Sequence, residues 1–454
     1  MVKKLGKGSM DMCNGPLFGK IILYTIPVML TGVLQLLFNA ADLMVVGRFC
    51  GSISVAAVGA TSSLTNLLVN LFMGLSVGAG VTVAQGLGAH DNRKVSATVH
   101  TAIPVALIGG GILTLLGICF SEIFLRWMGT PTDVLPLSAI YMRFYFGGMI
   151  FNMLYNYGAA ILRAAGDTTR PLIYLTIAGV LNVILNVIFV TIFHMNVAGV
   201  ALATSISQGV SAALVLITLA RRNDACRLIF KKMQIHKAPL KRMLYIGIPA
   251  GVQGSLFSIS NVIIQSSVNS FGSTVMSGHA AAGTLEGFVY TSMNALHQAA
   301  LNFTGQNTGA RKFDRVKKIF GICLGSVTVM GLLLGGLFWV LGKPLLSIYI
   351  TDSEAAIGYG FLRLTYICLP YFLAGVMDVV SGSIRGLGVS LQPMIVTILG
   401  VCVFRVVWIY TIFQVPAFHT LDCIYLSYPI SWTITSIAHI ITFLCILKKK
   451  RAAE

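Results

Sequence analysis

Four ionisable side chains lie well inside long apolar stretches of the sequence: Asp42, Glu286, Asp378 and Arg405. A charge at bilayer depth costs at least about 2.5 to 3.5 kcal/mol, so such residues usually face a cavity and act in transport. A carboxylate in that position is suited to bind and release a proton or a sodium ion. For Arg405 the alternative is structural, namely an ion pair with Asp378 or Glu286.

Asp42 belongs to a polar stripe, because Gln35, Asn39 and Asp42 stand at i, i+4 and i+7 and therefore share one helix face. Similarly spaced stripes in the same half of the chain are Asn152 and Asn156, then Asn182 and Asn186, then Thr204, Gln208 and Ser211. If these faces converge, they form a polar chamber around one carboxylate. The alternative is interhelical hydrogen bonding that serves only helix packing.

The second half has its own stripes, which are Glu286, Tyr290, Asn294 and His297, and then Asp378, Ser381 and Arg385. Glu286, Tyr290, Asp378 and Arg405 are the candidate functional residues there. His297 alone is more typical of an interior histidine whose hydrogen bonds are satisfied.

Pro27 is a candidate hinge, because a proline inside a helix removes a backbone hydrogen bond and can bend it. Pro249 holds the corresponding place in the second half. The alternative for both is a proline tolerated near a helix start.

The composition of the chain indicates the class of protein to which these residues belong. Of 454 residues 56% are hydrophobic and only 10% are charged, with a mean hydropathy of +0.84. These values indicate an integral membrane protein, and the continuous apolar runs indicate an all-α polytopic fold. The nine cysteines show no zinc-ligand spacing, so we expect no metal site and no cofactor.

Breaks at Gly, Pro and charge clusters divide the chain into twelve expected spans. They are 18–47, 53–87, 95–119, 134–160, 169–193, 197–220, 243–270, 275–307, 316–341, 355–383, 391–414 and 421–447.

Basic residues orient these spans. The net charge is +18, from 32 Lys and Arg against 14 Asp and Glu, a surplus that in a soluble chain would indicate nucleic acid. With a cytoplasmic N-terminus, most basic residues fall on the inner side, beginning with Lys3, Lys4 and Lys7, which precede a retained first span. Only Arg48, Arg126, Arg143, Lys343 and Arg363 fall outside. The surplus therefore reflects topology, with both termini cytoplasmic, and predicts no nucleic-acid partner.

The chain repeats itself at an offset of about 222 residues, a signature of repeat architecture. Pro27 is matched by Pro249, and Arg163, Gly166 and Pro171 by Arg385, Gly388 and Pro393. We therefore predict two pseudo-symmetric six-helix bundles, with residues 1–220 as the N-terminal lobe, 221–242 as a basic cytoplasmic linker and 243–454 as the C-terminal lobe. Parallel repeats of this kind are typical of alternating-access transporters.

Several stretches carry a family resemblance that covers essentially the whole chain. They are residues 26–30 (IPVML), 39–48 (NAADLMVVGR), 162–171 (LRAAGDTTRP), 181–186 (LNVILN), 199–204 (GVALAT) and 381–388 (SGSIRGLG). In order and combination they resemble the multidrug and toxic compound extrusion (MATE) family, in its DinF-type bacterial branch.

The resemblance implies an antiporter, driven by H+ or Na+, that exports amphipathic or cationic drugs and toxic compounds from a bacterial plasma (inner) membrane. By position, Asp42 resembles the coupling aspartate of the family, and Gln35, Asn156, Asn182 and Thr204 resemble its pocket partners. Together with the polar stripes, this predicts ion coupling by Asp42, Asn182, Asn186 and Thr204, and substrate binding by Gln35, Asn39, Asn152 and Asn156. Asp378 falls where some branches use a second acid. Asn186 stands where the branch commonly has Asp, which leaves the coupling ion open.

Other functions were weighed against this one. A flippase for lipid-linked saccharide or other lipid precursors shares the architecture, but it usually carries several cations in its cavity. An enzyme would need a catalytic cluster, and no HExxH motif or paired-carboxylate constellation with a partner base appears near a membrane surface. We expect a multi-pass monomer whose partners are small molecules and the lipid bilayer.

Overall fold

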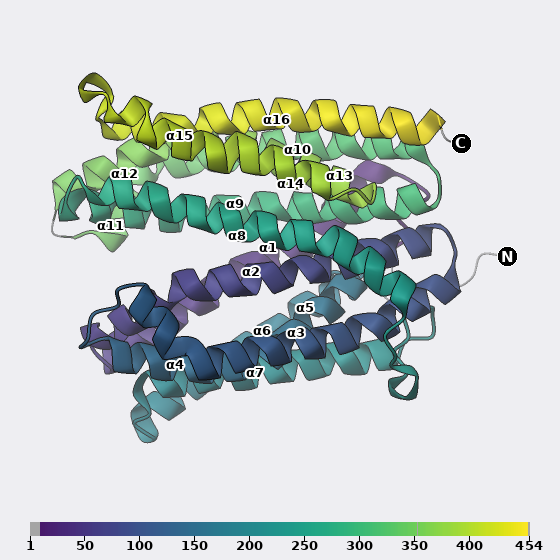
Figure 1. The fold of residues 1–454 in the computed structure, drawn as a ribbon, viewed down its shortest axis with the longest axis horizontal. Helices are drawn as coiled ribbons and strands as arrows, with labels where there is room; N and C mark the ends of the chain where they lie inside the picture. The colour runs from purple at the N-terminus through teal and green to yellow at the C-terminus, as the bar shows by residue number, and fades with distance from the viewer. Residues whose placement is uncertain (1–9, 352, 453–454) are drawn as a thin grey trace. The chain divides into compact units, whose positions relative to one another are not determined.

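The computed structural model describes residues 10–351 and 353–452, and every regular element in these ranges is a helix (Figure 1). The basic residues Lys3, Lys4 and Lys7, which contribute to the predicted orientation, lie outside the described residues.

The first half of the chain forms seven α-helices and one short π-helical segment. They are α1 (Leu17–Phe49), α2 (Ser52–Gly88), α3 (Asn92–Trp127), α4 (Leu135–Gly147), α5 (Met149–Ala164), α6 (Thr169–Val187), η1 (Ile188–Ile192) and α7 (Asn196–Ala220). Because α4 and α5 meet at Gly148, together they account for the predicted span 134–160. A short 3-10 turn, η2 (Phe230–Lys232), lies in the basic linker.

The second half follows the same plan. Its elements are α8 (Lys237–Asn269), α9 (Ser273–Gly309), α10 (Phe313–Val340), α11 (Gly342–Tyr349), α12 (Glu354–Ile367), α13 (Tyr371–Gly386), α14 (Leu391–Thr397), η3 (Ile398–Val403), α15 (Phe404–Tyr410), η4 (Ile412–Gln414), η5 (Pro416–Phe418) and α16 (Leu421–Ala452). A bend of 47° separates α12 from α13 within one predicted span.

Length and composition identify nine helices in the described ranges that could cross a membrane, or ten with the bent pair α12 and α13. The two other predicted spans are also helical. One is divided between α4 and α5, of 13 and 16 residues, and the other is α9, whose 37 residues include His279, Glu286 and His297. All twelve predicted spans therefore coincide with helical segments.

The internal repeat is visible in the lengths of the helices. Both α1 and α8 have 33 residues, α2 and α9 have 37, and α5 and α13 have 16. The turns after α5 and α13 also match, because Gly166 and Gly388 adopt φ values of 85° and 83°, a left-handed conformation that glycine adopts most readily.

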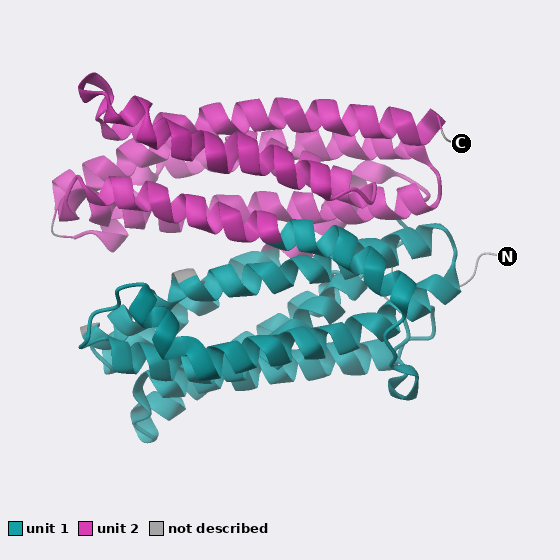
Figure 2. Ribbon diagram, viewed as in Figure 1, with its two compact units in different colours: residues 1–12, 30–251 teal, residues 13–29, 252–454 magenta. Residues whose placement is uncertain are grey.

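Contacts divide the chain into two compact units whose boundaries lie within helices. Unit 1 contains residues 30–251, and unit 2 contains residues 13–29 and 252–454. The first part of α1 therefore belongs to unit 2, and the first part of α8 to unit 1; Figure 2 shows α8 changing colour along its length. Pro27 and Pro249 lie just before these changes. The lobe limits at 220 and 243 remain a prediction from the sequence.

Four glycines bring α2 and the first part of α8 close together within unit 1. A Cβ atom on Gly74 would lie 2.1 Å from the backbone nitrogen of Gly251, and one on Gly78 would lie 2.2 Å from the carbonyl oxygen of Met243. On α8, a Cβ on Gly247 would lie 2.6 Å from the Cα of Leu75. Each helix thus presents a GxxxG pattern, which permits direct contact between helix backbones in membranes.

The first part of α1 is held in unit 2 by different chemistry. The Asn302 side chain of α9 donates a hydrogen bond to the Tyr24 hydroxyl at 2.8 Å, and the Tyr24 ring meets the Phe303 ring edge to face at 5.5 Å. Tyr24 is fully buried, so this contact fixes one turn of α1 against α9.

We predict that Gly251→Leu lowers the melting temperature of the purified protein in detergent, because no space exists for a side chain there; overpacking typically costs about 1 to 3 kcal/mol. Gly111→Leu is the matched control, since nothing lies within 4 Å of a Cβ at Gly111. Equal melting temperatures for the two variants would contradict the close contact.

We predict that the linker and the turn after α3 lie on opposite sides of the membrane. The test uses Gln234→Cys and Thr132→Cys, both at exposed positions, in a background with the exposed Cys119 and Cys445 replaced by serine. A membrane-impermeant maleimide should label Thr132→Cys in intact cells and Gln234→Cys only after permeabilisation. The reverse pattern would invert the predicted orientation.

Candidate functional site

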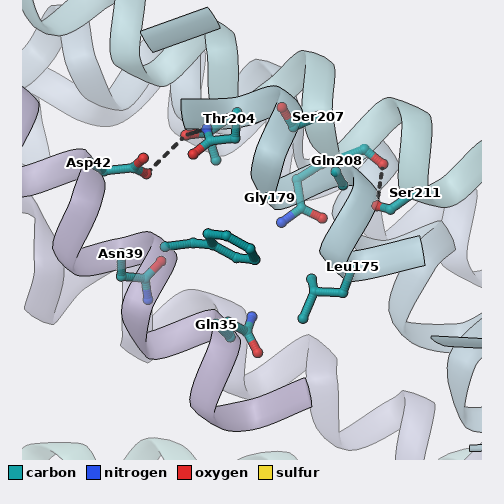
Figure 3. Close-up of a pocket in the computed structure, with 12 residues that line it drawn as sticks. Gln35, Asn39, Asp42, Leu175, Gly179, Thr204, Ser207, Gln208 and Ser211 are labelled. Carbon is teal, nitrogen blue, oxygen red and sulfur yellow. Dashed lines mark hydrogen bonds between the residues drawn. The ribbon is translucent and has the colours of Figure 1, made fainter. Parts of the chain in front are cut away.

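A small polar cavity lies within unit 1, where α1, α6 and α7 meet. Its volume is about 60 Å³. Figure 3 shows Gln35, Asn39 and Asp42 on α1 facing Thr204, Ser207 and Gln208 on α7. The complete lining is Gln35, Phe38, Asn39, Asp42, Leu175, Ala178, Gly179, Asn182, Thr204, Ser207, Gln208 and Ser211. The polar faces predicted on these three helices therefore converge.

Local packing explains how α1 approaches α6. A Cβ atom at Gly179 would lie 1.9 Å from the Phe38 ring, so the ring occupies the space that a side chain would fill. One turn beyond, Asn182 lines the cavity, and one turn further Asn186 contacts Asp42, before α6 widens into the π-helical segment η1. Such π-helical segments are frequent at functional sites.

Asp42 is held by amide and hydroxyl groups alone. The Asn186 side-chain nitrogen donates a hydrogen bond to Oδ1 of Asp42 at 2.5 Å, and the Thr204 hydroxyl lies 3.4 Å from Oδ2. When the Asn182 amide is oriented to satisfy both of its polar atoms, its nitrogen also donates to Oδ1 at 2.7 Å. Its oxygen then accepts from the Thr204 hydroxyl at 3.2 Å.

No positive side chain compensates this carboxylate. Throughout residues 10–351 and 353–452, none of the ion pairs includes Asp42. An intramembrane carboxylate without a counter-ion is neutralised by a proton or by a bound cation. The surroundings of Asp42 thus suit a group that exchanges one of these ions.

The volume of the cavity limits what it can hold. Drug-sized ligands occupy clefts of roughly 300 to 1,000 Å³, whereas this cavity of about 60 Å³ has room for an ion and a few waters. Gln35 and Asn39 are exposed, so the cavity is open along that edge of α1. A cavity of this volume suits an ion better than a drug-sized ligand.

The stripe on α5 does not join the cavity. Asn156 donates to the Asn152 side-chain oxygen at 3.0 Å and to its backbone oxygen at 2.8 Å, and neither residue belongs to the lining. Substrate binding by Asn152 and Asn156 stays a prediction without support from this geometry.

In unit 2, Glu286 is paired with an arginine. Nε and Nη2 of Arg363 each donate to one carboxylate oxygen of Glu286 at 2.7 Å, and Nη1 also contacts His279. Both partners are buried. Arg363, which the charge count assigned to the outer side, thus lies buried within α12, and Arg405 is not the only buried arginine of a predicted span. The sequence already indicated this position within a helix, because Arg363 falls inside the predicted span 355–383.

The suggested ion pair of Arg405 with Asp378 or Glu286 is wrong. Arg405 is 1% exposed, and its guanidinium lies 4.0 Å from the centre of the Tyr428 ring and 5.6 Å from that of Trp432. Its Nε donates to the Ser431 hydroxyl at 2.9 Å. Cation–π contact replaces a carboxylate here, within the described residues.

Asp378 lies among polar side chains of α9. Its side chain lies close to that of Tyr290, and its backbone oxygen lies 2.6 Å from Nδ1 of His297. Arg385, on the same helix as Asp378, donates to Gln253 at 2.7 Å. His297 thus has the satisfied interior environment predicted for it, while ion coupling by Asp378 and Tyr290 stays a prediction.

We predict that Glu286→Gln destabilises the protein, because it leaves the buried Arg363 without its counter-charge. Removing one member of a buried pair typically costs about 3 to 5 kcal/mol. The melting temperature in detergent should fall in Glu286→Gln and recover at least partly in the double variant Glu286→Gln/Arg363→Met. No recovery would mean that the pair is not the source of the loss.

Comparison with known proteins identifies the family. The profile of the MatE family matches the chain twice, over residues 27–188 and 249–411, which confirms the internal repeat. The chain is 29% identical over 396 residues to a probable multidrug resistance protein, YpnP, of Bacillus subtilis, covering 87% of this chain and 88% of that one. It is 23% identical over 399 residues to a probable multidrug resistance protein, NorM, of Thermotoga maritima, covering 85% and 83%.

A solved structure confirms the fold. The outward-facing conformation of a multidrug resistance MATE family transporter of the MOP superfamily matches with a TM-score of 0.92 at 21% identity, over 99% of this chain and 100% of that one. The all-α fold of twelve transmembrane helices in two bundles is thereby confirmed. The chain therefore belongs to the MatE family of multidrug and toxic compound extrusion transporters, and it is a membrane transporter rather than an enzyme.

Proposed function

We propose that this transporter exports amphipathic or cationic compounds in exchange for an inward-moving cation, and that Asp42 takes up and releases that cation. The observation that carries the proposal is the environment of Asp42, a carboxylate in an intramembrane cavity whose described partners are all neutral. Gln35 and Asn39 line the same cavity, so ion uptake and substrate contact would share one surface of α1.

The protonation state of Asp42 would determine which hydrogen bonds connect α1 to α6 and α7. In its charged form the carboxylate accepts hydrogen bonds from Asn186 and Asn182 of α6, with the hydroxyl of Thr204 on α7 close by. Protonation would convert one oxygen into a donor and weaken acceptance from the amides. Charged and protonated Asp42 would therefore make different hydrogen bonds. Such a difference allows a transporter to favour one conformation when the ion is bound and another when it is not.

The proton is the coupling ion that this arrangement supports best. Hard cations take oxygen ligands, yet Asn186 and Asn182 direct nitrogen, not oxygen, at Oδ1 of Asp42. The presence of Asn186 also means that this part of α6 supplies no second carboxylate. Sodium coupling would require the Asn186 amide to turn its oxygen toward Asp42.

Flippase activity is not favoured. The relatives compared above are named as multidrug resistance proteins. A pyrophosphate-carrying lipid would need cations in the cavity, but its lining contains no Lys or Arg. In unit 2, Arg363 and Arg405 are already engaged by Glu286 and by aromatic rings. We further propose a monomer in the bacterial inner membrane, with both termini in the cytoplasm.

We predict that Asp42→Asn folds normally but loses gradient-driven export by at least about tenfold, because an amide cannot carry the proton. The measurement is export of a cationic dye from liposomes, driven separately by a pH gradient and by a sodium gradient. Wild type should respond to the pH gradient.

Asp133→Asn is the matched control, since it makes the same chemical change at an exposed position outside the cavity. It should retain wild-type export. Full export by Asp42→Asn would refute the role of Asp42, and export driven by sodium alone would refute proton coupling.

A further inference from the structure

A second cavity of unit 1 lies where α6 begins and α7 ends, next to the basic linker. Its volume is about 470 Å³. Arg170 and Tyr174 line it from α6, and Leu214, Ile217 and Arg221 line it from α7. It is large enough for part of an organic ligand. The proposed export mechanism makes no use of it.

One end of this cavity is basic. Arg170, Arg221 and Arg222 all line it, and Arg221 is exposed and forms no salt bridge within the described ranges. Two carboxylates hold the others in place, since Arg170 lies 3.2 Å from Asp167 and Nε of Arg222 donates to Asp224 at 2.9 Å. Arg221 therefore contributes a positive charge at this end that no salt bridge within the described ranges balances.

Burial raises the pKa of Asp167, and the backbone N–H of Arg170 together with the charges of Arg170 and Arg222 partly offsets that effect. The acid that positions Arg170 is only 2% exposed. It therefore orients the Arg170 guanidinium from within the protein.

The other end of the cavity is apolar. The Tyr174 hydroxyl and the Thr218 hydroxyl lie 2.5 Å apart and bridge α6 to α7. Ile217 beside them is 47% exposed, as are Ile173 and Ile177 along α6. Ile173, Ile177 and Ile217 belong to membrane-spanning helices. The exposed apolar surface that they form, the apolar seam, is therefore suited to contact with hydrocarbon.

We propose that this cavity binds an anionic phospholipid, with the headgroup phosphate on Arg170 and Arg221 and an acyl chain along the seam of α6 and α7. The position fits, because α6 begins at Thr169 and α7 ends at Ala220, so the arginines stand at the level of lipid headgroups. Basic pockets between helices on the cytoplasmic side are suited to such headgroups. A cationic drug would be repelled by the same arginines, and a soluble phosphate would leave the apolar seam unused.

The consequence for transport follows from which helices the lipid would touch. The same two helices carry Asn182 and Thr204 in the Asp42 cavity. A lipid seated between their cytoplasmic ends would therefore stabilise the packing of two walls of that cavity. This inference does not depend on the proposed coupling ion or on the exported substrate.

The test is native mass spectrometry of the full-length protein in a neutral detergent, with equimolar phosphatidylglycerol and phosphatidylcholine. Wild type should retain phosphatidylglycerol at least about fivefold more than phosphatidylcholine. Arg221→Gln should reduce this preference, and Arg170→Gln/Arg221→Gln should abolish it. Lys231→Gln/Lys232→Gln is the control, because it removes the same number of charges from exposed linker residues that do not line the cavity.

Three outcomes would overturn the proposal: no preference in wild type, a preference that survives in Arg170→Gln/Arg221→Gln, or an equal loss in the control. Inorganic phosphate forms a further arm, and competition by it at millimolar concentration would indicate a site for soluble anions instead. Replacing Arg170 also removes its ion pair with Asp167. Arg221→Gln leaves that pair intact, so a reduced lipid preference in this variant at an unchanged melting temperature does not result from misfolding.

Discussion

A carboxylate within a bilayer must be neutralised, and the two units of this transporter meet that requirement in different ways. Glu286 has a permanent counter-ion in Arg363, which is held to it by two hydrogen bonds of 2.7 Å. Asp42 has only amide and hydroxyl neighbours, so its charge can be removed by an ion that comes and goes. One carboxylate is therefore suited to hold helices together, and the other is suited to respond to a gradient. The roles of α1, α6 and α7 follow from that difference.

Close packing of helix backbones is the second requirement, because apolar side chains gain little by meeting each other rather than lipid. Gly74 and Gly251 allow α2 and α8 to touch, and Gly179 allows the Phe38 ring of α1 to pack on α6. In unit 2, a buried tyrosine and asparagine hold the start of α1 instead. Small residues therefore decide which helices approach, and polar residues then fix their orientation.

The sequence predicted the helices and the convergence of the polar faces on α1, α6 and α7, because helical periodicity assigns each polar residue to a face. The stripe of Gln35, Asn39 and Asp42 does meet Asn182 and Thr204, as expected. Periodicity does not say which neighbour a face meets, which is why Asn152 and Asn156 were grouped with them although they bond to each other. Arg363 was assigned to the outside by charge counting, which ignored its depth in the helix. The division of α1 and α8 between units could not be read from a repeat that both halves share.

The length of α1 has a mechanical consequence. A helix rises about 1.5 Å per residue, so the cavity residue Asp42 stands roughly 22 Å beyond Pro27 along the axis. A bend of ten degrees at Pro27 would then displace Asp42 by about 4 Å, more than the length of a hydrogen bond. Since the chain passes from unit 2 to unit 1 just after Pro27, a hinge at that residue would make α1 a lever with its fulcrum at that passage. With such a hinge, a small change in the direction of α1 would be enough to break the hydrogen bond between Asp42 and Asn186.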